Sequence, residues 1–194
     1  MKYRNVTISG LPGSGSSTLG RSLAQKLGWE YFSGGEFMRN YAIEKGFLKP
    51  ELKIHHLATV YNDEFDREVD YRMRGWLKEK QGKVLDSWLS GFLAQGTEGT
   101  LKVLMKCSND EIRIDRLVNR DGISVEEAKK HVFEREEKNL KKWTRMYQKE
   151  WRDWVGERKI DFYHPSLYDL VIDTYSLDRD SSLKKTLKVL EAYV

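Results

Sequence analysis

The sequence predicts a three-layer α/β/α fold built on a five-stranded parallel sheet. Short apolar runs alternate along the chain with segments in which apolar residues recur every three or four positions, the pattern of alternating strands and helices. The runs are short and apolar throughout, as expected for strands that helices cover on both faces. Gly10, Ser33, Asp86 and Cys107 come at or just after the ends of four runs, where ligands bind in such sheets.

The expected elements follow one another in a regular order. Gly28 and Gly46 mark the ends of the first two helices. The turn at 108–110 supplies an N-cap, and Ser124 with Glu127 forms a capping box at the start of a long helix. Residues 148–165 are aromatic and charged, with weak periodicity. The expected strands are 4–9, 29–33, 84–86, 101–107 and 170–173, and the other expected helices are 19–27, 36–45, 50–62, 66–80, 110–119 and 181–193.

Composition limits the class of protein. The 194 residues, 33% charged and 39% apolar, suit one globular domain. No apolar run approaches the length of a membrane span, and residues 1–4 lead directly into a strand, so we expect neither a membrane segment nor a signal peptide. The single cysteine, Cys107, fits a reducing cytoplasm. The net charge of +4 suits either nucleic acid or polyanionic nucleotides as partners and does not decide between them.

A glycine-rich turn between the first strand and the first helix predicts a phosphate-binding loop. Its backbone amides can converge on an anion, and the helix that begins near Ser16 adds free N–H groups and the positive end of its dipole. The turn matches the Walker A pattern G-x-x-x-x-G-K-[ST] at both glycines and at Ser17, with Ser16 in place of the lysine. A glycine-rich turn without a ligand is the alternative. The loop comprises Gly10, Leu11, Pro12, Gly13, Ser14, Gly15, Ser16, Ser17 and Thr18.

Two further groups of residues carry chemistry that suits phosphates. Glu36 and Arg39 lie three residues apart on one helix face after the second strand, where an arginine can grip a phosphate and a carboxylate can orient it. An exposed ion pair is the alternative. Basic residues recur at helical spacing in the second half of the chain, where they either close over phosphates or form a solvated face. They are Arg113, Arg116, Arg120, Arg135 and Lys142.

In combination the motifs resemble the short, archaeal type of cytidylate kinase. Segments 10–18, 33–39, 66–70, 84–92, 111–120 and 168–174 occur in the order seen in that family, and the resemblance covers essentially the whole chain. It implies a single P-loop kinase domain over 1–194, with a nucleoside-monophosphate-binding segment at about 33–82 and a mobile lid at about 111–150. Such an enzyme transfers the γ-phosphoryl group of ATP, with Mg²⁺, to CMP or dCMP.

The resemblance also implies roles for individual residues. Residues 10–18 would hold the ATP phosphates, and Ser17 would contact Mg²⁺. The lid arginines would be Arg116, Arg120 and Arg135, which neutralise charge around the transferring group. The CMP pocket would comprise Ser33, Gly34, Glu36, Arg39, Asp86 and Trp88. ATP and CMP or dCMP are then the expected partners of a cytoplasmic monomer that binds neither nucleic acid nor membranes.

Two departures from the family pattern leave alternatives open. Ser16 removes the cation that normally reaches the β- and γ-phosphates, so a nucleotide-binding protein without turnover is one alternative. Trp88 stands where the family has an arginine, and it either stacks on a pyrimidine or belongs to the core. A kinase for another small acceptor is therefore a second alternative. An RNA-binding module that stacks bases on Trp143, Trp151 and Trp154 is a third, although we expect these residues to pack the lid against the core.

The remaining candidate residues indicate a function less specifically. Asp86 either binds Mg²⁺ through water, contacts the acceptor nucleotide or caps the end of its strand. His55, His56, His131 and His164 have neither the spacing nor the cysteine companions of a zinc site.

Overall fold

The computed structural model describes residues 2–46 and 61–191 and confirms the predicted fold class. Five parallel strands form one sheet in the order β2-β3-β1-β4-β5, so the chain crosses over between non-adjacent strands. Parallel pairing brings the carboxyl ends of all five strands to one edge of the sheet. The strands are β1 Asn5–Gly10, β2 Glu30–Ser33, β3 Lys83–Asp86, β4 Thr100–Lys106 and β5 Leu170–Asp173.

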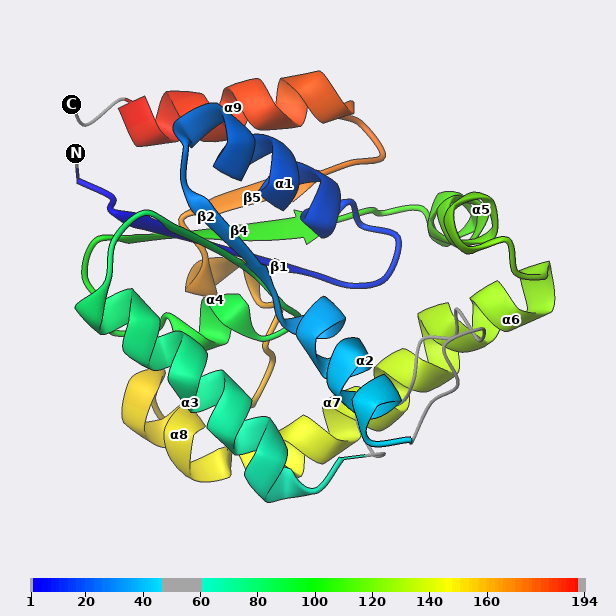
Figure 1. Ribbon diagram of the computed structural model, residues 1–194, viewed down its shortest axis with the longest axis horizontal. Coiled ribbons are helices and arrows are strands. Elements are labelled where there is room, and N and C mark those ends of the chain that lie inside the picture. The colour runs from blue at the N-terminus through cyan, green and yellow to red at the C-terminus, as the bar shows by residue number, and fades with distance from the viewer. Residues whose placement is uncertain (1, 47–60, 192–194) are drawn as a thin grey trace.

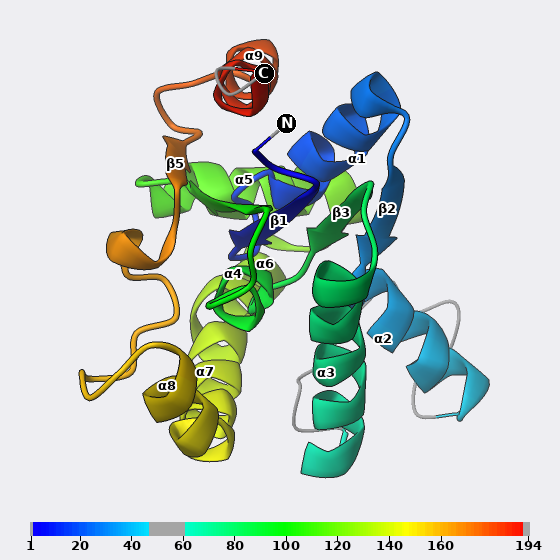
Figure 2. The same ribbon diagram turned by 90° about the vertical axis from the view of Figure 1, so that its left-hand side faces the viewer.

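Helices cover both faces of the sheet (Figures 1 and 2). One face carries α1 (Ser16–Leu27) and α9 (Arg179–Glu191), and the other carries α3 (Asp63–Glu79), α4 (Ser90–Leu93), α7 (Arg135–Met146) and α8 (Gln148–Trp154). Figure 1 places α2 (Gly34–Glu44), α5 (Asp110–Asp121) and α6 (Val125–Lys129) beyond the carboxyl ends of the strands. These last helices therefore surround the edge at which ligands bind.

Alternation along each strand divides the core into two layers. In β4, Leu101 and Met105 pack toward α1 and α9, whereas Leu104 packs toward α3, α4 and α7. In β3, Val84 and Leu85 divide in the same way. Because successive side chains of a strand point to opposite faces, a strand apolar at every position must be covered on both sides. Both layers are well buried, as the apolar strand runs predict.

Local capping explains most of the helix boundaries. The capping box of Ser124 is present, and the side chain of Asn109 accepts from the Ile112 backbone at 3.0 Å, as the sequence predicts. α3 begins three residues earlier than expected because Asn62 caps it, accepting from the Phe65 backbone at 2.8 Å. The helix expected over 50–62 lies outside the described residues apart from 61 and 62, which are not helical.

Three features differ from the expected elements. The long helix after Ser124 is divided by a π-helical turn at Lys130–Glu134, so that α6 and α7 are separate helices. Two helices, α4 and α8, were not predicted. In α8 the buried face includes a charged residue, Glu150, beside Trp151, and this mixture obscures the periodicity. Trp143 and Trp151 are both in the core, where they pack α7 and α8 against the sheet.

Polar side chains connect α3 to α7 and α8 on the face of the sheet that these helices cover. Lys142 of α7 donates to Asp66 of α3 at 2.8 Å, and both side chains are buried. Tyr147 donates to Asp70 at 2.6 Å, and Arg145 pairs with Asp63 at 2.8 Å. Arg67 pairs with Glu150. The wall formed by α3 and α7 is thus fixed by contacts that span 70 to 90 residues of sequence.

Candidate active site

The phosphate loop is held from outside by two arginines of α5. Arg113 donates through Nε to the carbonyl of Pro12 at 3.0 Å, and Arg116 donates through Nη1 to the carbonyl of Gly13 at 2.9 Å. Gly13 has a φ of 79°, and a Cβ there would lie 2.7 Å from the carbonyl oxygen of Arg113. The loop and α5 therefore approach each other more closely than any residue but glycine allows.

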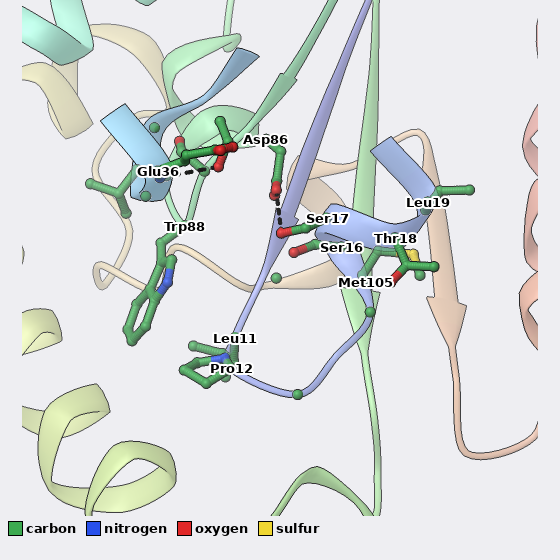
Figure 3. Close-up of a pocket in the computed structure, with 18 of the residues that line it drawn as sticks. Leu11, Pro12, Ser16, Ser17, Thr18, Leu19, Glu36, Asp86, Trp88 and Met105 are labelled. Atoms are coloured by element: carbon green, nitrogen blue, oxygen red, sulfur yellow. Dashed lines mark hydrogen bonds between the residues drawn. The ribbon is translucent and has the colours of Figure 1, made fainter. Parts of the chain in front are cut away.

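The first turn of α1 presents hydroxyl groups to a buried carboxylate (Figure 3). Ser17 Oγ donates to Asp86 Oδ2 at 2.6 Å, and Tyr31 Oη donates to the same oxygen at 2.9 Å. Burial raises the pKa of Asp86, while the hydrogen bonds from Ser17, Tyr31 and Ser16 favour the ionised form. Asp86 thus lies where the phosphate loop, β2 and β3 meet, and its neighbour Ser16 occupies the position of the missing lysine.

One cavity of about 1190 Å³ joins the phosphate loop to the wall formed by α3 and α7. It exceeds the roughly 300–1,000 Å³ of pockets that hold one small molecule. Of the residues predicted for the loop, the CMP pocket and the lid arginines, all but Ser14 line this cavity, and the side chain of Ser14 is buried within the loop. Arg113 and Lys142, the other two basic candidates, do not line it. The lining residues from the prediction are Gly10, Leu11, Pro12, Gly13, Gly15, Ser16, Ser17, Thr18, Ser33, Gly34, Glu36, Arg39, Asp86, Trp88, Arg116, Arg120 and Arg135.

Three arginines from different helices line the cavity near one another. Arg39 of α2, Arg120 of α5 and Arg135 of α7 all line it. Burial, together with the nearby positive charges of Arg39 and Arg120, lowers the pKa of Arg135 to about 10. Repulsion between guanidinium groups costs free energy that an anion in the cavity would relieve. The cluster is therefore arranged for a polyanionic ligand.

The three predicted lid arginines differ in their surroundings. Arg116 is bonded to the loop and to Thr174, at 2.7 Å from the side-chain hydroxyl and 2.8 Å from the carbonyl. Arg120 is exposed and pairs with its neighbour Asp121 at 2.7 Å. The guanidinium of Arg135 lies over the indole of Trp88, 4.9 Å from the ring centroid. Arg116 thus braces the loop, whereas Arg120 and Arg135 face the space between loop and wall.

Another side of the cavity is formed by α2 and the segment after β3. Ser33 caps α2, accepting from the Glu36 backbone at 3.2 Å. Glu36 pairs with Arg21 of α1 at 2.8 Å rather than with Arg39, and both side chains are about half exposed. Trp88 is half-buried and packs edge-to-face on Trp143, with ring centroids 5.3 Å apart, while also lining the cavity. It therefore belongs to both the core surface and the cavity wall.

No individual role was predicted from the sequence for four residues of this site, two of which lie in segments 66–70 and 168–174. Tyr31 and Thr174 were not singled out, although they bond to Asp86 and Arg116. Arg21 follows Ser17 by four residues on α1, the spacing that puts two side chains on one helix face. Asp70 lines the cavity four residues after Asp66. Two like charges at that spacing on a face that also carries Val69 and Met73 are the signal that could have found it.

The matching family model is that of the cytidylate kinase-like family, and it covers residues 5–176. The chain belongs to this family. A cytidylate kinase of Haloarcula marismortui is 34% identical over 188 residues, covering 97% of this chain and 90% of the relative. A cytidylate kinase of Methanopyrus kandleri is 33% identical, covering 97% and 92%. The relatives are thus matched over nearly their whole length.

Solved structures with the same fold are much more distant in sequence. A shikimate kinase of Acinetobacter baumannii, solved with shikimate, superimposes with a TM-score of 0.55 at 15% identity, covering 98% of this chain and 94% of that one. An uncharacterised protein of Eubacterium ventriosum gives a TM-score of 0.64 at 15% identity, covering 97% and 99%. These likenesses establish the α/β fold of the chain.

The oxygen atoms beside the phosphate loop fit Mg²⁺. Ser17 Oγ and the carboxylate of Asp86 lie together at the start of α1, and Mg²⁺ prefers such ligands combined with substrate phosphates and water. Within 2–46 and 61–191 no group of three or more His, Cys, Asp and Glu side chains could hold a metal by itself. A metal at Ser17 would therefore depend on the nucleotide for its other ligands.

Within residues 2–46 and 61–191 no helix is long and apolar enough to cross a membrane.

Proposed function

We propose that this protein transfers the γ-phosphoryl group of ATP to CMP or dCMP, giving ADP and CDP or dCDP. The observation that carries the proposal is the single cavity that joins a phosphate loop to a second, separately built wall through a cluster of arginines. Such a cavity holds two anions in line, and phosphoryl transfer needs this alignment more than it needs covalent chemistry. The named cytidylate kinases that match nearly the whole chain support CMP as the acceptor.

In this proposal the donor phosphates lie on the amides of residues 10–18 and the N-terminus of α1. Ser17 and Asp86 would hold Mg²⁺, which neutralises charge on the phosphates when it is bound. Arg39, Arg120 and Arg135 would surround the transferring group. Because the acceptor oxygen belongs to an anionic phosphate, transfer is direct, without a general base or a covalent enzyme intermediate.

The acceptor nucleotide would lie between α2, α3 and Trp88. Ser33, Gly34 and Glu36 would contact it, with residues of about 33–82 as the acceptor-binding segment and about 111–150 as the lid. Ser16 would leave the phosphates without the usual ammonium group, so the arginines and the helix N-terminus would supply the positive charge. We also propose that the protein is a monomer.

A coupled assay of ADP release with a panel of nucleoside monophosphates tests this proposal. We expect ADP to be released fastest with CMP or dCMP, and only in the presence of Mg²⁺. Faster turnover of AMP or UMP would assign the enzyme to another acceptor. ATP binding by calorimetry without transfer to any monophosphate would favour a nucleotide-binding protein that lacks turnover.

The variant Ser16→Lys tests the phosphate loop in the same assay. An ammonium group at this position would reach the β- and γ-phosphates as in other loops of this pattern. We therefore expect Ser16→Lys to keep or raise kcat/KM for CMP. Its complete loss, with the melting temperature unchanged, would contradict a phosphate-binding role for the loop.

A further inference from the structure

A carboxyl group lies on the acceptor wall of the cavity among apolar side chains. Asp70 projects from α3 and lines the cavity together with Val69 and Met73, while Trp88 and Trp143 line it from neighbouring segments. Flat aromatic and apolar surfaces of this kind suit a nucleobase, whose ring stacks on them. A polar group among them meets the edge of the base.

The carboxyl group of Asp70 is half-buried, and no cation in the described part of the chain forms an ion pair with it. Among the described residues, the Tyr147 hydroxyl is the only group that donates a hydrogen bond to it, from Oη to Oδ2 at 2.6 Å. The cations nearby are engaged elsewhere: Lys142 donates to Asp66, and Arg67 pairs with Glu150. Oδ1 has no hydrogen-bond partner within the described part of the chain, and the side chain lines the cavity. Ionising a carboxyl group in such a position costs free energy unless a ligand donates a hydrogen bond to it.

Resting on the proposed function, we propose that Asp70 Oδ1 accepts a hydrogen bond from the 4-amino group of cytosine and thereby selects CMP over UMP. Cytosine offers N–H donors at position 4, where uracil has a carbonyl oxygen, and a carboxylate is the usual acceptor for the cytosine amino group. Uracil would direct its O4 at the carboxylate oxygen, and two acceptors repel each other. The sugar is not involved, so CMP and dCMP are treated alike.

Tyr147 determines what an asparagine would do at this position. Its hydroxyl donates to one oxygen of Asp70. In Asp70→Asn the amide oxygen would take over this hydrogen bond, which leaves the amide N–H₂ facing the cavity. An N–H donor suits O4 of uracil and opposes the 4-amino group of cytosine. The variant should therefore change preference rather than lose activity generally.

The experiment measures kcat/KM and, by calorimetry, Kd for CMP and UMP with wild type and Asp70→Asn. We expect the CMP-to-UMP ratio to fall roughly 5- to 150-fold in both measurements, with CMP weakened and UMP strengthened, which is the discrimination of about 1–3 kcal/mol that a base contact provides. The nucleotide of 2-pyrimidinone, which lacks the 4-amino group, should be a poorer ligand than CMP for wild type only. Asp63→Asn is the matched control, because Asp63 is on the same helix, pairs with Arg145 and does not line the cavity.

Equal losses for CMP and UMP in Asp70→Asn would show that Asp70 acts only on the structure and would overturn the inference. An unchanged ratio would overturn it as well, with the proposed kinase function left intact by turnover of CMP. Wild-type protein that binds CMP and UMP equally would also refute it. Failure of the proposed function is a different result, in which no monophosphate accepts phosphate although the binding preference is still measured.

Discussion

Replacing Asp70 by asparagine should stabilise the fold, and more so at alkaline pH. Burial raises the pKa of Asp70 from 3.8 to about 7, against the hydrogen bond from Tyr147. The charged groups around it are Asp66, which raises the pKa, and Lys142 and Arg67, which lower it. Between pH 4 and 7 the folded state holds a proton that the unfolded chain has released, so stability falls as pH rises through this range.

The magnitude follows from the shift. One unit of pKa corresponds to about 1.4 kcal/mol. A rise of roughly three units costs at most about 4 kcal/mol above pH 7, and about 2 kcal/mol at pH 5, where the folded carboxyl is still mostly protonated. An asparagine carries no charge at either pH. The gain in unfolding free energy of Asp70→Asn over wild type should thus be about 2 kcal/mol larger at pH 8.5 than at pH 5.

Urea denaturation at the two pH values measures this difference directly. Asp63→Asn serves as the control, since it removes an exposed carboxylate from the same helix and should show no such pH-dependent gain. The same gain at both pH values, or a larger gain at pH 5, would refute the argument that burial of the Asp70 charge costs stability. Site-specific stabilisation of this kind is common where a protein retains a costly group for its activity.

Two further pairs of variants test the surroundings of the phosphate loop and of Arg135. Gly13→Ala and Gly15→Ala both place a side chain on a left-handed backbone, which costs about 1–2 kcal/mol of stability. Only at Gly13 does the new Cβ meet the Arg113 backbone, so Gly13→Ala should cost roughly 1–3 kcal/mol more than Gly15→Ala. Equal losses of stability in thermal unfolding would refute the close approach. Trp88→Leu removes the ring beneath Arg135 and should lower kcat/KM for CMP about 2- to 30-fold. Trp88→Phe keeps an aromatic ring there and should retain most of the activity. Equal effects of the two variants would show that the ring does not position Arg135.

The strands of the sheet could be predicted from the sequence because strand formation depends on local patterns. Short apolar runs bounded by Gly10, Ser33 and Asp86 place three strand ends within one residue of the observed ones. Parallel pairing then brings these ends together whatever the loops do. The helix caps at Asn109 and Ser124 are equally local, and both were predicted.

Features that depend on partners distant in sequence could not be predicted from local patterns. α8 is a helix whose buried Glu150 is compensated by Arg67 and Tyr71, more than seventy residues earlier, so its pattern does not look amphipathic. Glu36 pairs with Arg21 on another helix rather than with its helical neighbour Arg39. Such choices are made by the tertiary structure, and spacing along the chain does not contain them.

The most direct test of the account is the single-turnover transfer of the γ-phosphoryl group from labelled ATP to CMP, measured for wild type and Arg135→Met. In the proposed function, arginines and backbone amides bind the triphosphate without the usual lysine. Wild type should form labelled CDP, and Arg135→Met should slow the step by about 10³, the lower end of what a transition-state arginine contributes. ATP that stays bound to wild type without labelling CMP, or a variant as fast as wild type, would contradict it.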